Sequence, residues 1–260
     1  MNNLMTIDIS NWTMVDLVRR QAAQYGEREF ISFEQGVRLS FADLDRKSDE
    51  LARHLADLGV GAADRVLALI KNRAELLISY FAANKLGAII VPINTELKGA
   101  FLQHQLQNSA PSVVLVDIDL ISAFDDVAAG EVKVSTVVVV AGKVPAEMPG
   151  LFSDSQKLAF DELPTAPDVA LVTPSPHDIS CIMYTSGTTG PAKGVLMPHG
   201  HCYLAAYGSA VNISLDENDY YYVCMPLFHA NGLFIQVIAS LICGAQVYVV
   251  ERFSPNSWLD

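Results

Sequence analysis

Charged residues are scarce in this chain of 260 residues, and basic residues are the scarcest. Asp, Glu, Lys and Arg make up 18% of the sequence, with 17 Lys and Arg against 29 Asp and Glu. The formal net charge of −12 argues against a nucleic-acid partner, because binding to a phosphate backbone needs clustered basic residues. A hydrophobic content of 51% excludes a disordered or collagen-like chain. The length allows one large α/β domain or two smaller ones.

The sequence also lacks a targeting segment and a disulfide pattern. No basic residue precedes Arg19 and no apolar run occupies the first twelve positions, so we expect no signal peptide. Gly244 interrupts the uncharged stretch 230–250, which predicts a buried helix and strand rather than a transmembrane segment. The cysteines form no C-x-x-C pair, and we expect reduced thiols in a cytoplasmic protein; they are Cys181, Cys202, Cys224 and Cys243.

The first sixty residues predict a helix, a hairpin and a second helix. The helix covers about 14–24, and the hairpin strands are 28–33 and 37–39. Ser40 with Asp43 three residues later predicts a capped helix start.

From residue 65 onward, continuous apolar runs alternate with helical segments, the pattern of strands buried on both faces. We therefore expect an α/β fold of stacked, mostly parallel sheets flanked by helices. Residues 1–141 are expected to form a first subdomain and 142–178 an irregular connector that holds six of the twelve prolines. Residues 179–260 are expected to form a second, truncated subdomain.

One segment rich in glycine and hydroxyl groups carries the clearest functional signal. Residues 184–194 read YTSGTTGPAKG and directly follow the apolar run ISCIM. Glycines let backbone N–H groups approach a ligand, and hydroxyls and the Lys193 ammonium add donors and charge, a set suited to a phosphate chain. Lys193 is the only Lys or Arg between Lys157 and Arg252, so an anion bound here would depend on it. The alternative is a solvated Gly/Thr turn, but flexible linkers seldom interrupt buried strands.

A Walker A loop is the obvious competitor for this segment. Its Gly-x4-Gly-Lys-Ser/Thr pattern would require glycine in place of Ala192 and a hydroxyl in place of Gly194. A P-loop ATPase or kinase is therefore disfavoured.

Several segments together resemble the adenylate-forming superfamily, which includes acyl-CoA synthetases and other AMP-dependent synthetases and ligases. TSGTTG followed by Lys193-Gly194 is similar to the family's phosphate-binding loop, and KLGAIIVPIN and PLFHANGL are similar to two further family segments. The family pattern places proline immediately before the lysine, whereas here Pro191 stands one position earlier. This departure leaves Lys193 in register and constrains Gly190, which now precedes proline.

The resemblance implies a two-step reaction, in which a carboxylate attacks Mg-ATP to form an acyl-adenylate and the acyl group then passes to coenzyme A. The implied cofactors are ATP, Mg²⁺ and coenzyme A, and the implied partner is a small-molecule carboxylate. By the same resemblance, the β- and γ-phosphates contact Thr185, Ser186, Gly187, Thr188, Thr189, Gly190 and Lys193. His229 in PLFHANGL is the candidate catalytic residue near the carboxylate, and a core histidine at a helix start is its alternative. The pair His199-x-His201 lacks the further ligands that a zinc site needs.

The final residues, SPNSWLD, begin a new helical pattern, and the family's later adenine, ribose and lysine segments have no counterpart here. We therefore expect an N-terminal part of a longer synthetase that is inactive alone. Its unfinished sheet favours either self-association into a homo-oligomer or marginal stability. Two alternatives stay open: an aryl- or amino-acid-adenylating enzyme, and a non-catalytic nucleotide-binding module.

Overall fold

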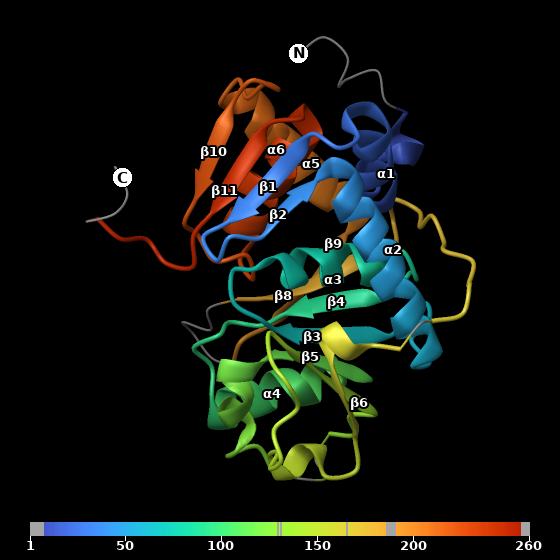
Figure 1. Cartoon of the computed structure of the whole chain (residues 1–260), viewed down its shortest axis with the longest axis vertical. Helices are drawn as coiled ribbons and strands as arrows, with labels where there is room; N and C mark the ends of the chain where they lie inside the picture. The colour runs from blue at the N-terminus through green and yellow to red at the C-terminus, as the bar shows by residue number, and fades with distance from the viewer. Residues whose placement is uncertain (1–7, 129, 131, 165, 186–190, 256–260) are drawn as a thin grey trace.

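Two β-sheets lie one above the other along the long axis of the molecule, with helices between and around them (Figure 1). The computed structural model describes residues 8–128, 130, 132–164, 166–185 and 191–255. The core between the sheets includes Ile31 of one sheet, Val66 of the other and Phe81 of the helix between them, all fully buried. A second apolar cluster covers the opposite face of the larger sheet.

The larger sheet has seven strands in the order β7-β6-β5-β3-β4-β8-β9. All neighbouring pairs are parallel except β8 and β9, which form an antiparallel hairpin. The strands are β3 (Arg65–Leu69), β4 (Ile89–Pro92), β5 (Val113–Asp117), β6 (Thr136–Val140), β7 (Gln156–Ala159), β8 (Ile179–Tyr184) and β9 (Gly194–Pro198).

The smaller sheet combines strands from both ends of the described chain, in the order β10-β11-β1-β2. Strands β10, β11 and β1 are parallel, and β2 pairs antiparallel with β1. The strands are β1 (Glu29–Phe33), β2 (Arg38–Ser40), β10 (Tyr220–Val223) and β11 (Gln246–Val249).

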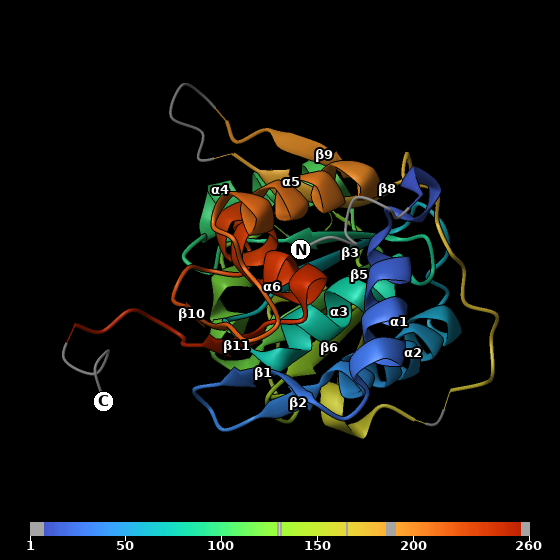
Figure 2. The ribbon, with the colours of Figure 1, turned by 90° about the horizontal axis from the view of Figure 1, so that it is seen from above.

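Helices fill the space between the sheets and cover their outer faces. Helix α3 lies between the sheets and is buried at every position but one, which its almost uniformly apolar sequence requires. Seen from above, α1 and α2 lie together at one side of the molecule, whereas α5 lies beside β8 and β9 (Figure 2). The helices are α1 (Met14–Tyr25), α2 (Phe41–Asp57), α3 (Ala74–Asn84), α4 (Gly99–Ser109), α5 (His199–Asn212), the π-helix η6 (Asn231–Ile238) and α6 (Ala239–Cys243); the 3₁₀ turns are η2 (Ile9–Asn11), η3 (Ile118–Phe124), η4 (Gly150–Phe152) and η5 (Phe160–Glu162).

The predicted fold class is confirmed: the chain is α/β, with mostly parallel sheets flanked by helices. The predicted capping box is also present, with the Ser40 side chain accepting from the backbone of Asp43 and the Asp43 side chain accepting from that of Ser40. All four cysteines have free thiols, of which Cys181 and Cys202 are buried. None of the helices in the described part of the chain combines the length and apolar character needed to cross a membrane.

The sheets divide the chain differently from the predicted segments 1–141, 142–178 and 179–260. Strands β8 and β9 complete the sheet that β3 to β7 begin, and β1 and β2 join the late strands β10 and β11. The expected connector contributes strand β7 at the edge of the large sheet. Apolar periodicity predicts a strand but not its partner, because pairing depends on contacts between distant parts of the chain.

Asn72 joins the two sheets through its buried side chain. It follows β3, and only 4% of its surface is exposed. Its Nδ2 donates to the carbonyl oxygens of Met225 (3.1 Å) and Val250 (3.0 Å), while its Oδ1 accepts from the Leu227 amide (2.8 Å). One carboxamide thus connects the carboxyl end of β3 to the segments that follow β10 and β11.

Replacing Asn72 with aspartate should destabilise the fold strongly. A carboxylate cannot donate to the two carbonyl oxygens, so we expect Asn72→Asp to lower the free energy of unfolding by about 2–4 kcal/mol. Urea denaturation measures this change. Asn212→Asp, at an exposed position on α5, is the matched control and should cost less than about 1 kcal/mol. Equal stability of the two variants would contradict the role given to Asn72.

His199 connects α5 to α1 and is 1% exposed. Its Nδ1 accepts a hydrogen bond from the Met14 backbone amide at 3.2 Å, so this nitrogen must be unprotonated. Burial lowers the pKa of His199 from 6.5 to about 4, with Asp178 acting in the opposite direction. The ring therefore has a structural contact at the start of α1.

This histidine predicts a pH-dependent stability. The unfolded chain binds a proton near pH 6.5 and the folded chain only near pH 4, so the stabilisation is complete above pH 6.5 and is lost as the pH falls to 4. The full difference corresponds to about 3 kcal/mol. Between pH 7 and pH 4, wild-type protein should lose about this much more unfolding free energy than His199→Asn, which keeps a side-chain acceptor. If the unfolding free energies of the two proteins changed equally with pH, His199 would not be the source of the pH dependence.

Candidate functional site

The predicted phosphate-binding loop connects β8 to β9 at the carboxyl end of β8. Thr185 and Lys193, the two described ends of the loop, lie side by side. The Thr185 amide donates to the Lys193 carbonyl oxygen at 3.0 Å, and the Lys193 amide donates to Thr185 Oγ1 at 3.1 Å. Both residues are exposed. The other predicted loop residues (Ser186, Gly187, Thr188, Thr189 and Gly190) lie outside the described residues.

Gly194 explains how the hairpin closes immediately after Lys193. A Cβ atom at this position would lie 2.9 Å from Ile182 Cγ2 and 3.3 Å from Asn108 Oδ1. A side chain at this position would therefore require the Ile182 side chain of β8 and the Asn108 side chain of α4 to move. In the Lys-Gly dipeptide, Lys193 therefore supplies an exposed charge, and Gly194 allows the close packing of β9 against β8 and α4.

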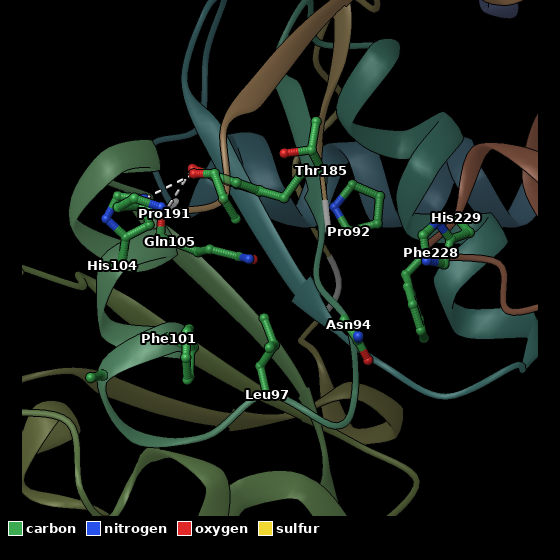
Figure 3. A pocket seen from close by; sticks show the side chains of 13 residues that line it. Pro92, Asn94, Leu97, Phe101, His104, Gln105, Thr185, Pro191, Phe228 and His229 are labelled. Atoms are coloured by element: carbon green, nitrogen blue, oxygen red, sulfur yellow. Dashed lines mark hydrogen bonds between the residues drawn. The ribbon is translucent and has the colours of Figure 1, made fainter. Parts of the chain in front are cut away.

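A cavity of about 430 Å³ opens beside the base of the loop. Its walls come from the segment after β4, from α4, from the β8–β9 hairpin and from residues 228–229 (Figure 3). Among the described residues, no Asp, Glu, Lys or Arg side chain lines it; the lining residues are Pro92, Asn94, Leu97, Ala100, Phe101, His104, Gln105, Tyr184, Thr185, Pro191, Ala192, Phe228 and His229. The cavity therefore suits a ligand with a substantial apolar part.

His229 and Phe228 lie on the side of the cavity opposite His104 and Phe101 (Figure 3). The His229 amide donates to the Pro226 carbonyl oxygen, and its own carbonyl oxygen accepts from the Leu233 amide, which anchors the backbone at the entry to η6. The imidazole belongs to an exposed residue and is not locked in the core.

Gly232 permits this anchoring. A Cβ atom there would lie 2.4 Å from the Pro226 carbonyl oxygen and 2.8 Å from that of Met225. The glycine of PLFHANGL thus lets the start of η6 pack directly on the segment that carries His229.

Helix α4 supplies site residues that the sequence did not single out. His104 Nε2 lies 2.9 Å from the Ala192 carbonyl oxygen, which ties the helix to the loop. The Tyr184 hydroxyl donates to Asn108 Oδ1 (2.7 Å) and is 3.2 Å from the Gln105 carbonyl oxygen. Burial raises the pKa of Tyr184, which keeps the phenol protonated as a donor. The alternation of apolar runs with helical segments predicted helices between the strands, but it could not indicate what the side chains of this helix contact.

The described residues contain no group of three or more His, Cys, Asp or Glu side chains arranged to hold a metal ion. The zinc alternative at His199 meets a further obstacle, because His199 Nδ1 already accepts from Met14. The exposed Lys193 ammonium and the hydroxyl hydrogen of Thr185, which the described hydrogen bonds leave available at the loop, instead suit an anion.

Several known proteins are similar to this chain. A 2-succinylbenzoate–CoA ligase of Geobacillus kaustophilus is 33% identical over 251 residues, covering 95% of this chain and 46% of that protein. A crotonobetaine/carnitine–CoA ligase of Salmonella arizonae is 29% identical over 222 residues, covering 84% of this chain and 42% of that protein. The structure of o-succinylbenzoate CoA synthetase from Bacillus subtilis, in complex with the acyl-adenylate OSB-AMP, aligns with a TM-score of 0.76 and 28% identity, covering 94% of this chain and 57% of that one.

The chain thus spans less than half the length of these curated relatives. The pattern of the AMP-binding enzyme family matches residues 18–260, which include both the hairpin loop and the cavity. The resemblance predicted from the loop is confirmed, and the chain belongs to the AMP-binding enzyme family of the adenylate-forming superfamily.

Proposed function

We propose that this chain provides the phosphate-binding loop and part of the substrate cavity of an ATP-dependent ligase that joins a carboxylic acid to coenzyme A. The observation that carries the proposal is the pairing of Thr185 with Lys193 at the mouth of a neutral, largely apolar cavity that also contains His229. A phosphate chain and a carboxylic acid would then occupy adjacent places, as carboxylate attack on ATP requires.

Lys193 would orient and neutralise the β- and γ-phosphates that leave as pyrophosphate. It is the only Lys or Arg between Lys157 and Arg252 in a chain of net charge −12. The surrounding sequence therefore offers no replacement for its charge. Thr185, whose hydroxyl and amide hold the Lys193 backbone, would keep the two ends of the loop together. The remaining predicted phosphate contacts are Ser186, Gly187, Thr188, Thr189 and Gly190.

His229 is proposed to lie beside the carboxylate of the substrate. Its imidazole lies on the wall opposite α4, and the described lining residues include no Lys or Arg that could pair with a carboxylate. The relatives act on acids as different as 2-succinylbenzoate and crotonobetaine or carnitine, according to their names. The proposed substrate is accordingly a carboxylic acid, with aryl acids included.

The proposed cofactors are ATP, Mg²⁺ and coenzyme A. The donor set at the loop fits the phosphates of ATP, whereas the described residues offer no cluster for Mg²⁺. The metal would supply positive charge that offsets the negative charge of the phosphates; the role of this chain is to hold the phosphates.

Removing the Lys193 charge should weaken phosphate binding. Isothermal titration with magnesium pyrophosphate should show a dissociation constant about ten- to a hundred-fold higher for Lys193→Ala than for wild-type protein, the effect of one lost charge-assisted contact. Lys133→Ala makes the same charge change at an exposed site before β6 and should bind like wild type. Equal affinities in all three proteins would refute the phosphate role.

We further propose that the 260-residue chain binds phosphates without catalysing adenylation. Its relatives are more than twice as long, and group transfer needs all positioning groups together. ATP–pyrophosphate exchange with a panel of carboxylates should therefore stay at background for this chain. Exchange above background would show that these residues contain a complete site, and binding without exchange in any longer form would favour a nucleotide-binding module.

A further inference from the structure

The cavity beside the loop contains one buried polar atom without a partner. The Gln105 side chain extends from α4 towards the middle of the cavity (Figure 3). Only 4% of Gln105 is exposed, and its Oε1 accepts no hydrogen bond among the described residues. Buried carboxamide oxygens usually have a hydrogen-bond donor, and no described residue supplies one here.

The neighbouring polar groups in the cavity already have partners. The Tyr184 hydroxyl donates to Asn108 Oδ1, and His104 Nε2 pairs with the Ala192 carbonyl oxygen. Asn94 Oδ1 accepts from the Glu96 amide, and Thr185 Oγ1 accepts from the Lys193 amide. Among the side chains on the α4 and hairpin sides of the cavity, Gln105 Oε1 is the acceptor for which no described residue supplies a donor.

The surfaces around this oxygen are apolar. Phe101 belongs to α4, and Leu97 lies just before that helix. Pro92 lies at the end of β4, and Phe228 lies on the opposite wall. A ligand that fills this space must be mostly apolar, and a single donor on it could pair with Gln105. A site built in this way rejects an analogue that lacks the donor, because the protein oxygen then stays unpaired.

We propose that Gln105 determines specificity, by accepting a hydrogen bond from an N–H or O–H group on the apolar part of a ligase substrate. This assignment rests on the proposed function, which supplies two substrates able to carry such a donor: the carboxylic acid and the thiol acceptor. In this assignment Gln105 acts on substrate choice, and phosphate binding is left to the loop.

Two pairs of probes test the assignment. In each pair, one member is an amide and the other is the ester in which an oxygen replaces the N–H group. The carboxylate pair is N-acetyl-β-alanine and acetoxypropionate, and the thiol pair is N-acetylcysteamine and mercaptoethyl acetate. Dissociation constants are measured by ligand-observed NMR for wild type, Gln105→Met and Gln107→Met. Gln107 lies on the exposed face of the same helix and is the matched control.

Wild-type protein should prefer the N–H member of one pair by about tenfold, the usual value of one hydrogen bond to a buried acceptor. The pair that shows the preference identifies the substrate that Gln105 contacts. Gln105→Met should abolish the preference and Gln107→Met should retain it, while pyrophosphate binding stays unchanged in both, which separates this assignment from the phosphate role of the loop.

Several results would overturn the assignment. Equal affinities within both pairs for wild type, or no binding of either amide probe, would remove its basis even if Gln105→Met fails to fold. A preference that survives in Gln105→Met would place the acceptor elsewhere.

Discussion

The candidate site depends on one carboxamide that connects the two sheets. Asn72 follows β3 of the large sheet, and its three hydrogen bonds reach the segments after β10 and β11 of the small sheet. One of its partners, the Leu227 amide, belongs to the residue immediately before Phe228 and His229. Because a buried amide satisfies both donors and the acceptor only in one orientation, this contact sets where the His229 wall stands relative to the loop.

The cavity follows from this relation between the sheets. Three of its walls belong to the large sheet and to α4, which packs on that sheet, whereas Phe228 and His229 come from the segment that follows β10 of the small sheet. Gly194 and Gly232 remove the side-chain bulk that would separate these walls, at the hairpin and at the start of η6 respectively. The position of the cavity walls therefore depends on the hydrogen bonds of Asn72 and on the close packing that Gly194 and Gly232 allow.

Electrostatics divides the site into two parts with different tasks. The loop carries the single cation between Lys157 and Arg252, which suits it to a phosphate chain in an otherwise acidic protein. The adjoining cavity is lined without formal charge, so its selectivity must come from shape and from hydrogen bonds. Gln105 provides the hydrogen-bonding part of that selectivity, and the apolar walls provide the shape.

The sequence by itself determined the local elements and the chemistry of the loop. Continuous apolar runs predicted the buried strands, Ser40 with Asp43 predicted the helix cap, and YTSGTTGPAKG predicted an anion-binding loop at the end of β8, all through interactions between near neighbours in the chain. Only the tertiary structure decided that β8 and β9 complete the large sheet, that Asn72 joins the sheets, and that Gln105 points into the cavity. These features depend on contacts between residues far apart in the chain, and a lone Asn or Gln in a sequence carries no sign of whether folding will bury it or what it will face.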